Sequence, residues 1–311
     1  MLRNRFIIIS MKYIGIKEAA KKWGISDRRV RILCQEGRIE GAIKLEWSWT
    51  IPADTPKPTD GRSMRHLKNY DLRLGSIDIS RLNELKEKHP VSFGLSRSDA
   101  FGQIVKNLIC YASSLGERKL DPRIIATVLS GKVSHSAELS EHLLICNFRS
   151  VLISQIRTPD VEWNTKRLLE LNRSLLQGVD DEKGGVLREG VVDMPLTEKD
   201  MSLSVSLQVE TLFNQYEMEW KRLHPVFRSV LLYAGLLRIK PFDAYNEEFA
   251  VLVLLSMLLS AGFILPSLED GDVNEMNAAT AVAFRRGYYQ DLARIIERKL
   301  FESYEVLEDN A

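Results

Sequence analysis

The sequence predicts a mainly α protein with a small N-terminal domain and a larger helical domain that carries one short β-hairpin. Three observations lead to this fold class. The Pro-rich stretch "IPADTPKPTDGR", 51–62, separates two parts of the chain. Apolar residues recur at helical spacing through most of the second part. Only "KGGVLREGVVDMPL", 183–196, combines paired glycines, alternation and valines as an extended hairpin does.

These patterns divide the chain into four segments. Residues 1–10 are expected to be disordered or a mis-called start, because Met11 opens the segment "MKYIG". Residues 11–52 form the N-terminal domain, 53–67 the linker and 68–311 the helical domain. A chain of 311 residues is long enough for two separate cores.

Composition narrows the classes of function. The formal net charge is +1, so any attraction to nucleic acid must be local. Three cysteines at distant positions fit neither a disulfide framework nor a zinc site, which indicates a reducing cytoplasm. The apolar run 249–265 contains Ser256, Ser260 and Gly262 and follows two glutamates, so it is interpreted as a buried core helix and not a membrane span.

The N-terminal domain is predicted as a helix, a tight turn, a second helix and a short hairpin. Gly24 supplies the turn, and Ser26 is the expected N-cap of the second helix. The inward-facing residues are Ile16, Ala19, Ala20 and Trp23 on the first helix and Val30, Leu33 and Cys34 on the second. Within "KKWGISDRRVR" five residues are basic and one is acidic, so the outward face is positively charged.

This segment resembles the excisionase-like branch of the MerR-type winged helix-turn-helix family. The residues that carry the resemblance are "IKEAAKKWGISDRRVRILCQEGRIEGA" and the wing strand "SWTIP". The resemblance implies DNA binding through Arg28, Arg29 and Arg31 on the recognition helix and Lys44 in the wing. The alternative is a small protein-interaction module with a solvated basic face. A single such module makes few phosphate contacts, so tight site recognition would require dimerisation through the large domain.

In the helical domain, the periodicity predicts several amphipathic helices. One stripe is Ile104, Leu108 and Tyr111, and another, ended by Gly178, is Leu168, Leu171, Leu175 and Leu176. The segment "AVAFRRGYYQDLARIIERKLF" continues the helical pattern near the end of the chain.

Three segments of this domain resemble the Fic (Fido) family, whose active members transfer AMP from ATP to a protein hydroxyl. They are 167–194, with the Gly-x-x-Arg turn of the family's flap at Gly185 and Arg188; "RIKPFDAYNEEFAVLVLLSMLLSAGFILP"; and "AFRRGYYQDLARIIERKL". The flap normally binds a target peptide by strand addition, so the resemblance implies a possible protein partner there. The second segment aligns with the signature His-Pro-Phe-x-(Asp/Glu)-Gly-Asn-Gly-Arg.

The signature is degenerate at the positions that carry chemistry. Lys240 replaces the general-base histidine and, as an ammonium, is a poor base. Ala244 replaces the acid that holds magnesium, and Tyr245 replaces the first glycine of the phosphate cradle. Glu247 and Glu248 replace the second glycine and the arginine, which puts carboxylates where a polyanion would bind. Pro241, Phe242 and Asn246 are retained.

The resulting hypothesis is a cytoplasmic, prokaryotic-type DNA-binding regulator. Its Fic-like domain would be a pseudoenzyme that serves for dimerisation or for binding a partner or ligand, with no cofactor and no metal. The alternative is a protein adenylyltransferase or other nucleotidyltransferase with altered chemistry, which would use ATP and magnesium. Lys240 or Asp243 could take part in such chemistry, and a purely structural scaffold is a third possibility.

Two further patterns are weaker. "SHSAE" fits the Ser/Thr-x-x-x-Glu pattern of the family's inhibitory helix at Ser134 and Glu138, but the arginine it would pair with falls at Val251. A solvated helix face is the alternative. The histidines (His66, His89, His135, His142 and His224) show no metal-ligand spacing and are predicted to lie on the surface, with His135 and His142 on one helix face.

Overall fold

The computed structural model divides the chain into two compact units, Met1–Tyr70 and Asp71–Ala311. The structure describes residues 13–35, 39, 42–45, 48–53, 55, 77–91, 99–116, 119–157, 162–192 and 203–309. The predicted disordered start, 1–10, lies outside these ranges, as does the linker 53–67 except for Ala53 and Thr55.

The described residues of the first unit form two helices and a three-stranded antiparallel sheet. Its elements are β1 (Tyr13–Gly15), α1 (Ile16–Trp23), α2 (Asp27–Gln35), β2 (Ile43–Leu45) and β3 (Ser48–Pro52). The strand order is β1-β3-β2, with Ile14 opposite Ile51 and Lys44 opposite Trp49. The sequence did not predict β1, because three residues are too few to show an alternating pattern.

Local chemistry explains the boundaries of both helices. Gly24 ends α1 in the left-handed conformation, with φ of 65°, which glycine adopts without steric cost. The Ser26 hydroxyl accepts from the Arg29 amide at 3.3 Å, as expected of an N-cap. Six of the seven residues predicted to face inward are buried, and Ile16 packs against them, so the predicted core is confirmed.

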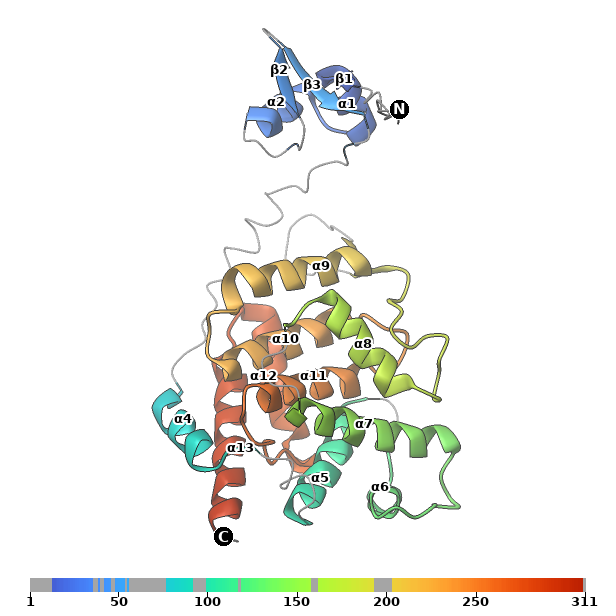
Figure 1. The fold of residues 1–311 in the computed structure, drawn as a ribbon, viewed down its shortest axis with the longest axis vertical. Helices are drawn as coiled ribbons and strands as arrows, with labels where there is room; N and C mark the ends of the chain where they lie inside the picture. The colour runs from blue at the N-terminus through green and yellow to red at the C-terminus, as the bar shows by residue number, and fades with distance from the viewer. Residues whose placement is uncertain are drawn as a thin grey trace, which may run out of the picture. The chain divides into compact units, whose positions relative to one another are not determined.

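The second unit is almost entirely helical, as the sequence predicts (Figure 1). Its helices are α4 (Ile79–Lys88), α5 (Asp99–Leu115), α6 (Pro122–Leu129), α7 (Leu139–Arg157), α8 (Thr165–Leu176), α9 (Val205–Gln215), α10 (Pro225–Ile239), α11 (Asn246–Ser260), α12 (Val273–Arg286) and α13 (Gln290–Asp309). A π-helical turn, Tyr216–Trp220, extends α9, and a 3-10 turn, Asp270–Asp272, precedes α12.

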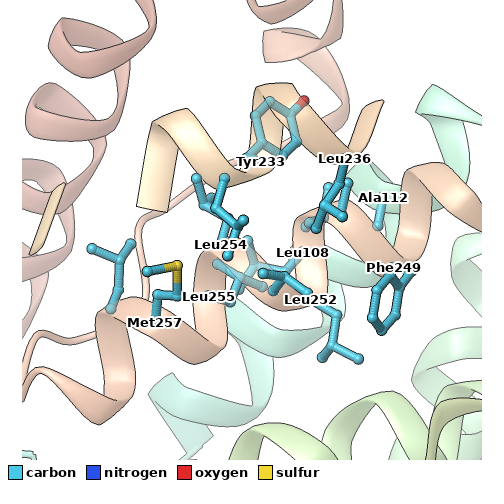
Figure 2. Packing of buried hydrophobic residues seen from close by; sticks show 14 of the residues in the cluster. Leu108, Ala112, Tyr233, Leu236, Phe249, Leu252, Leu254, Leu255 and Met257 are labelled. Atoms are coloured by element: carbon cyan, nitrogen blue, oxygen red, sulfur yellow. The ribbon is translucent and has the colours of Figure 1, made fainter. Parts of the chain in front are cut away.

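Helix α11 is the centre of this unit. It packs against α5, α7 and α10, and all but one of its residues are buried. Figure 2 shows its side chains Phe249, Leu252 and Leu255 among residues of α5 and α10. The prediction of a buried core helix is therefore confirmed. No helix of the described residues is long and apolar enough to cross a membrane.

Two predictions for this unit need correction. The pattern around "AFRRGYYQ" is not one continuous helix, because Gly287 adopts φ of 62° and caps α12 before α13 begins. The predicted hairpin is present with other bounds: β4 (Val191–Val192) pairs antiparallel with β5 (Leu203–Ser204), and residues 193–196 lie outside the described ranges. Residues 181–185 form turns, and Gly185 and Gly190 both have positive φ.

Candidate functional site

The loop between α10 and α11, residues 240–245, contains both non-glycine residues with positive φ in the described part of the chain. Lys240 has φ of 46° and caps α10, its amide donating to the Leu236 carbonyl at 2.8 Å. Tyr245 has φ of 58° and precedes the first residue of α11. Such conformations cost about 1 kcal/mol or more each and cluster at functional or formerly functional sites.

Asn246 holds this loop closed from inside. Its side chain is buried; Oδ1 accepts from the Phe242 amide at 2.9 Å, and Nδ2 donates to the Phe242 carbonyl at 2.8 Å. Phe242 in turn contacts Phe249 edge to face, with ring centroids 4.9 Å apart. The amide group that the sequence proposed as a catalytic remnant is therefore fully engaged in shaping the loop.

Arg188 ties the predicted flap to the end of α10. Its Nε donates to the Lys240 carbonyl at 2.6 Å and its Nη2 to the Ile239 carbonyl at 3.2 Å. The Arg188 amide donates to the Pro241 carbonyl at 2.9 Å. The last carbonyls of a helix have no partner within it, so a guanidinium satisfies them well.

Gly185 brings the same segment close to α8. Its amide donates to Asn172 Oδ1 at 2.8 Å, and its φ is 73°. A Cβ at this position would lie 2.7 Å from the Leu169 carbonyl oxygen, so a larger residue would force the segment away. The Gly-x-x-Arg turn thus has a packing role at both ends.

The start of α11 carries charged side chains of both signs. Lys240 Nζ lies 2.7 Å from Glu247 Oε1, while Glu248 is buried in the first turn. Both carboxylates sit where the helix dipole favours negative charge. Outside them, Ala244 is exposed and Asp243 lies 3.9 Å from Lys183. This helix start therefore carries its own anions.

The structure brings no set of metal ligands together. Within the described ranges, no group of three or more His, Cys, Asp or Glu side chains could hold a metal ion. Ala244, on the loop before α11, has only a methyl side chain and offers no metal ligand.

Ser134 and Glu138 lie in a turn ahead of α7, which begins at Leu139, so the helix predicted around them is wrong. His142 organises this turn: its Nε2 accepts from the Ser134 amide at 2.9 Å, and its Nδ1 lies 3.1 Å from the Glu138 carbonyl. His135 is part of the same turn and does not share a helix face with His142.

His224 also departs from the prediction of a surface residue. It is partly buried at the N-cap of α10, with Nδ1 accepting from the Val226 amide at 3.4 Å and Nε2 lying 3.3 Å from Asn83 Oδ1. Its pKa is lowered to about 4, because burial disfavours the charged ring and Lys86 and Arg228 repel it. The following Pro225, favoured in the first turn of a helix, was the sequence signal for this cap. His66 lies outside the described residues.

In the first unit, the basic residues proposed for DNA binding lie on helix α2 and strand β2. Arg28 and Arg31 are exposed on α2, and Lys44 is exposed on β2. Arg29 is partly buried and has an interaction within the protein. Two of the three arginines on α2 are thus exposed.

This chain resembles known proteins in its fold and not in its sequence. No protein-family model matches this sequence, and no curated protein matches it either. Solved structures do: residues 134–508 of Fic-1 from C. elegans align with a TM-score of 0.59 and 16% identity, covering 81% of this chain and 77% of that one. A Fic-domain signaling protein from Bacteroides thetaiotaomicron aligns with a TM-score of 0.58 and 17% identity, covering 74% and 95%. A Fic family protein from Desulfovibrio desulfuricans gives 0.55 and 16%, covering 76% and 77%.

The helical unit therefore has the fold of Fic domains. The part of the resemblance that concerns architecture is confirmed.

Proposed function

We propose that this protein is a DNA-binding regulator whose Fic-like domain has lost nucleotidyl transfer and acts in assembly or partner binding. DNA would bind through the first unit as a winged helix-turn-helix. The Fic-like domain would serve as a dimerisation or ligand-binding body, and the edge formed by β4 offers a place for a protein partner.

The observation that carries the loss of activity is the ion pair between Lys240 and Glu247 at the start of α11. A helix N-terminus attracts phosphate through its free amides and its dipole. Here Glu247 and Glu248 already supply negative charge at that position, and a polyanion would be repelled. Removing charge stabilisation of this kind takes away the largest contribution to phosphoryl-type transfer.

DNA binding is supported by the exposure of Arg28 and Arg31 on α2 and of Lys44 on the neighbouring sheet. Exposed guanidinium groups can contact phosphates and can donate two hydrogen bonds to guanine. Since the whole chain has a net charge of only +1, this local concentration of basic residues distinguishes the first unit.

The test for DNA binding is gel retardation with the promoter DNA of the protein's own gene over a series of salt concentrations. Arg28→Ala/Arg31→Ala should weaken DNA binding. It should also reduce the magnitude of the slope of log K against log salt concentration by about 2, because two phosphate contacts are lost. Lys17→Ala/Lys21→Ala removes two exposed charges from α1 and is the matched control. Equal losses in both variants would indicate unspecific attraction, and no retardation at low salt would overturn the proposal.

The test for inactivity is label transfer from α-labelled nucleoside triphosphates with magnesium, to the protein itself and to lysate proteins. We expect no label with any nucleotide. Label that disappears in Lys240→Ala would instead make Lys240 part of an unfamiliar transferase, the alternative that the fold permits.

A further inference from the structure

The middle of helix α12 is uncharged. Between Glu275 and Arg285 it contains no charged residue, although Ala278 is exposed and Val282 is partly exposed. The neighbouring α13, the long red helix that ends at the C-terminal marker in Figure 1, has charged residues throughout. Loss of charge in the centre of a surface is typical of the core of a protein–protein interface.

A groove runs between these two helices, with a volume of about 390 Å³. Its floor is apolar and consists of Ala278, Ala279 and Val282 on α12 and Ile295 on α13. Each helix lines the groove with positions spaced i, i+3, i+4 and i+7, which is one continuous helix face. Small residues on the floor allow another helix to approach closely.

The rim of the groove is balanced in charge. It contains two acids, Glu275 and Asp291, and two bases, Arg294 and Arg298. Arg298 Nη2 lies 2.6 Å from Glu275 Oε2, so this pair is satisfied internally. Asp291 has no ion-pair partner among the described residues, and Arg294 contacts only the neutral amide of Gln290 in that part of the chain. Among the described residues, neither Asp291 nor Arg294 therefore forms an ion pair.

We propose that the α12–α13 groove is a homodimer interface, in which the same face of a second copy packs around a two-fold axis with Arg294 opposite the second copy's Asp291. A two-fold interface uses one patch on both subunits, so the patch must be complementary to itself. An apolar floor beside one acid and one base that form no ion pair among the described residues meets this requirement, and the two helix pairs would form a four-helix arrangement. The proposal deepens the proposed function and rests on it in one respect: a dimer would place two DNA-binding modules on two half-sites.

Sedimentation velocity of the full chain tests the interface, at protein concentrations from about 1 to about 100 µM so that mass action can shift the equilibrium. Wild type is expected to dimerise in this range. Arg294→Asp and Asp291→Arg should each raise the dimer Kd by about tenfold or more, because like charges then meet across the axis. The double variant Arg294→Asp/Asp291→Arg should recover the affinity, since it exchanges the two charges.

Arg286→Asp makes the same change of charge at an exposed position outside the groove and should leave the Kd unchanged. Ala278→Glu, which places a charge on the floor, should give a monomer with an unchanged circular dichroism spectrum. A wild type that stays monomeric, or a dimer indifferent to these substitutions, would overturn the interface. A dimer that fails to retard DNA would instead leave the interface standing and overturn the DNA-binding role.

Discussion

Helices α2 and α11 begin in similar ways and carry opposite charge. A residue in the left-handed conformation precedes each: Gly24, which caps α1 and is followed by Ile25 and Ser26 before α2, and Tyr245, the N-cap of α11. The first turns of α2 expose Arg28 and Arg31, whereas the first turn of α11 contains Glu247 and Glu248. A helix N-terminus favours anions in either place, but the exposed lysine beside α11, Lys240, is paired with Glu247.

The comparison indicates where an external polyanion could bind in this protein. At α11 the two glutamates compensate the positive end of the helix dipole, and Lys240 pairs with Glu247. The charges at this helix start are therefore balanced within the protein. At α2 the first turn contains the acidic Asp27, and the exposed basic residues are Arg28 and Arg31. The loop at α11 is a structural part of the core, whereas α2 is a small helix that exposes Arg28 and Arg31.

The largest expected effect tests this division between core and surface. Phe249 is fully buried and contacts Phe242 of the loop. The substitution Phe249→Ala should lower the free energy of unfolding by about 3–5 kcal/mol, because it leaves a cavity beside Phe242. Arg31→Ala, at an exposed position, should change it by less than about 0.5 kcal/mol. Urea unfolding of both variants provides the measurement. A small loss in Phe249→Ala would mean that the loop is not supported by the core.

The start of a third helix, α10, should make the free energy of unfolding depend on pH. His224 at the start of α10 has its pKa lowered from 6.5 to about 4, so folding favours the neutral ring. The unfolded chain takes up the proton first, and stability present above pH 6.5 is lost as the pH falls towards 4. With allowance for partial exposure, the loss is about 2 kcal/mol.

His224→Asn keeps an N-cap acceptor and should remove most of this dependence. The measurement is the difference in unfolding free energy between neutral pH and pH 4.5 or so, in wild type and variant. An identical difference in both proteins would place the titration elsewhere.

The smallest effect concerns strain in the loop. Lys240→Ala and Lys240→Gly both lose the exposed ion pair with Glu247, which is worth at most about 1 kcal/mol. Only glycine adopts a φ of 46° freely, so Lys240→Gly should be more stable than Lys240→Ala by about 1 kcal/mol. Equal thermal stability of the two variants would show that the backbone at this position is unstrained.

Some features of the molecule were predictable because their causes are local. The stripe Leu168, Leu171, Leu175 and Leu176 is buried as predicted, since helical spacing alone puts these residues on one face. The Ser26 cap and the Gly24 turn follow from the hydrogen-bonding and steric properties of single residues. The strand β5 was not predicted, because a strand of two residues has no pattern of its own.

The sequence by itself determined the mainly helical fold class and the buried stripes of α1, α2 and α8. Only the tertiary structure decided that Arg188 reaches the carbonyl of Lys240, 52 residues along the chain, and that Asn246 folds into its own loop. It also decided that His224 is desolvated and that α12 and α13 form a groove. Caps and stripes depend on neighbours in the chain, whereas these contacts depend on how whole helices pack, which no local pattern specifies.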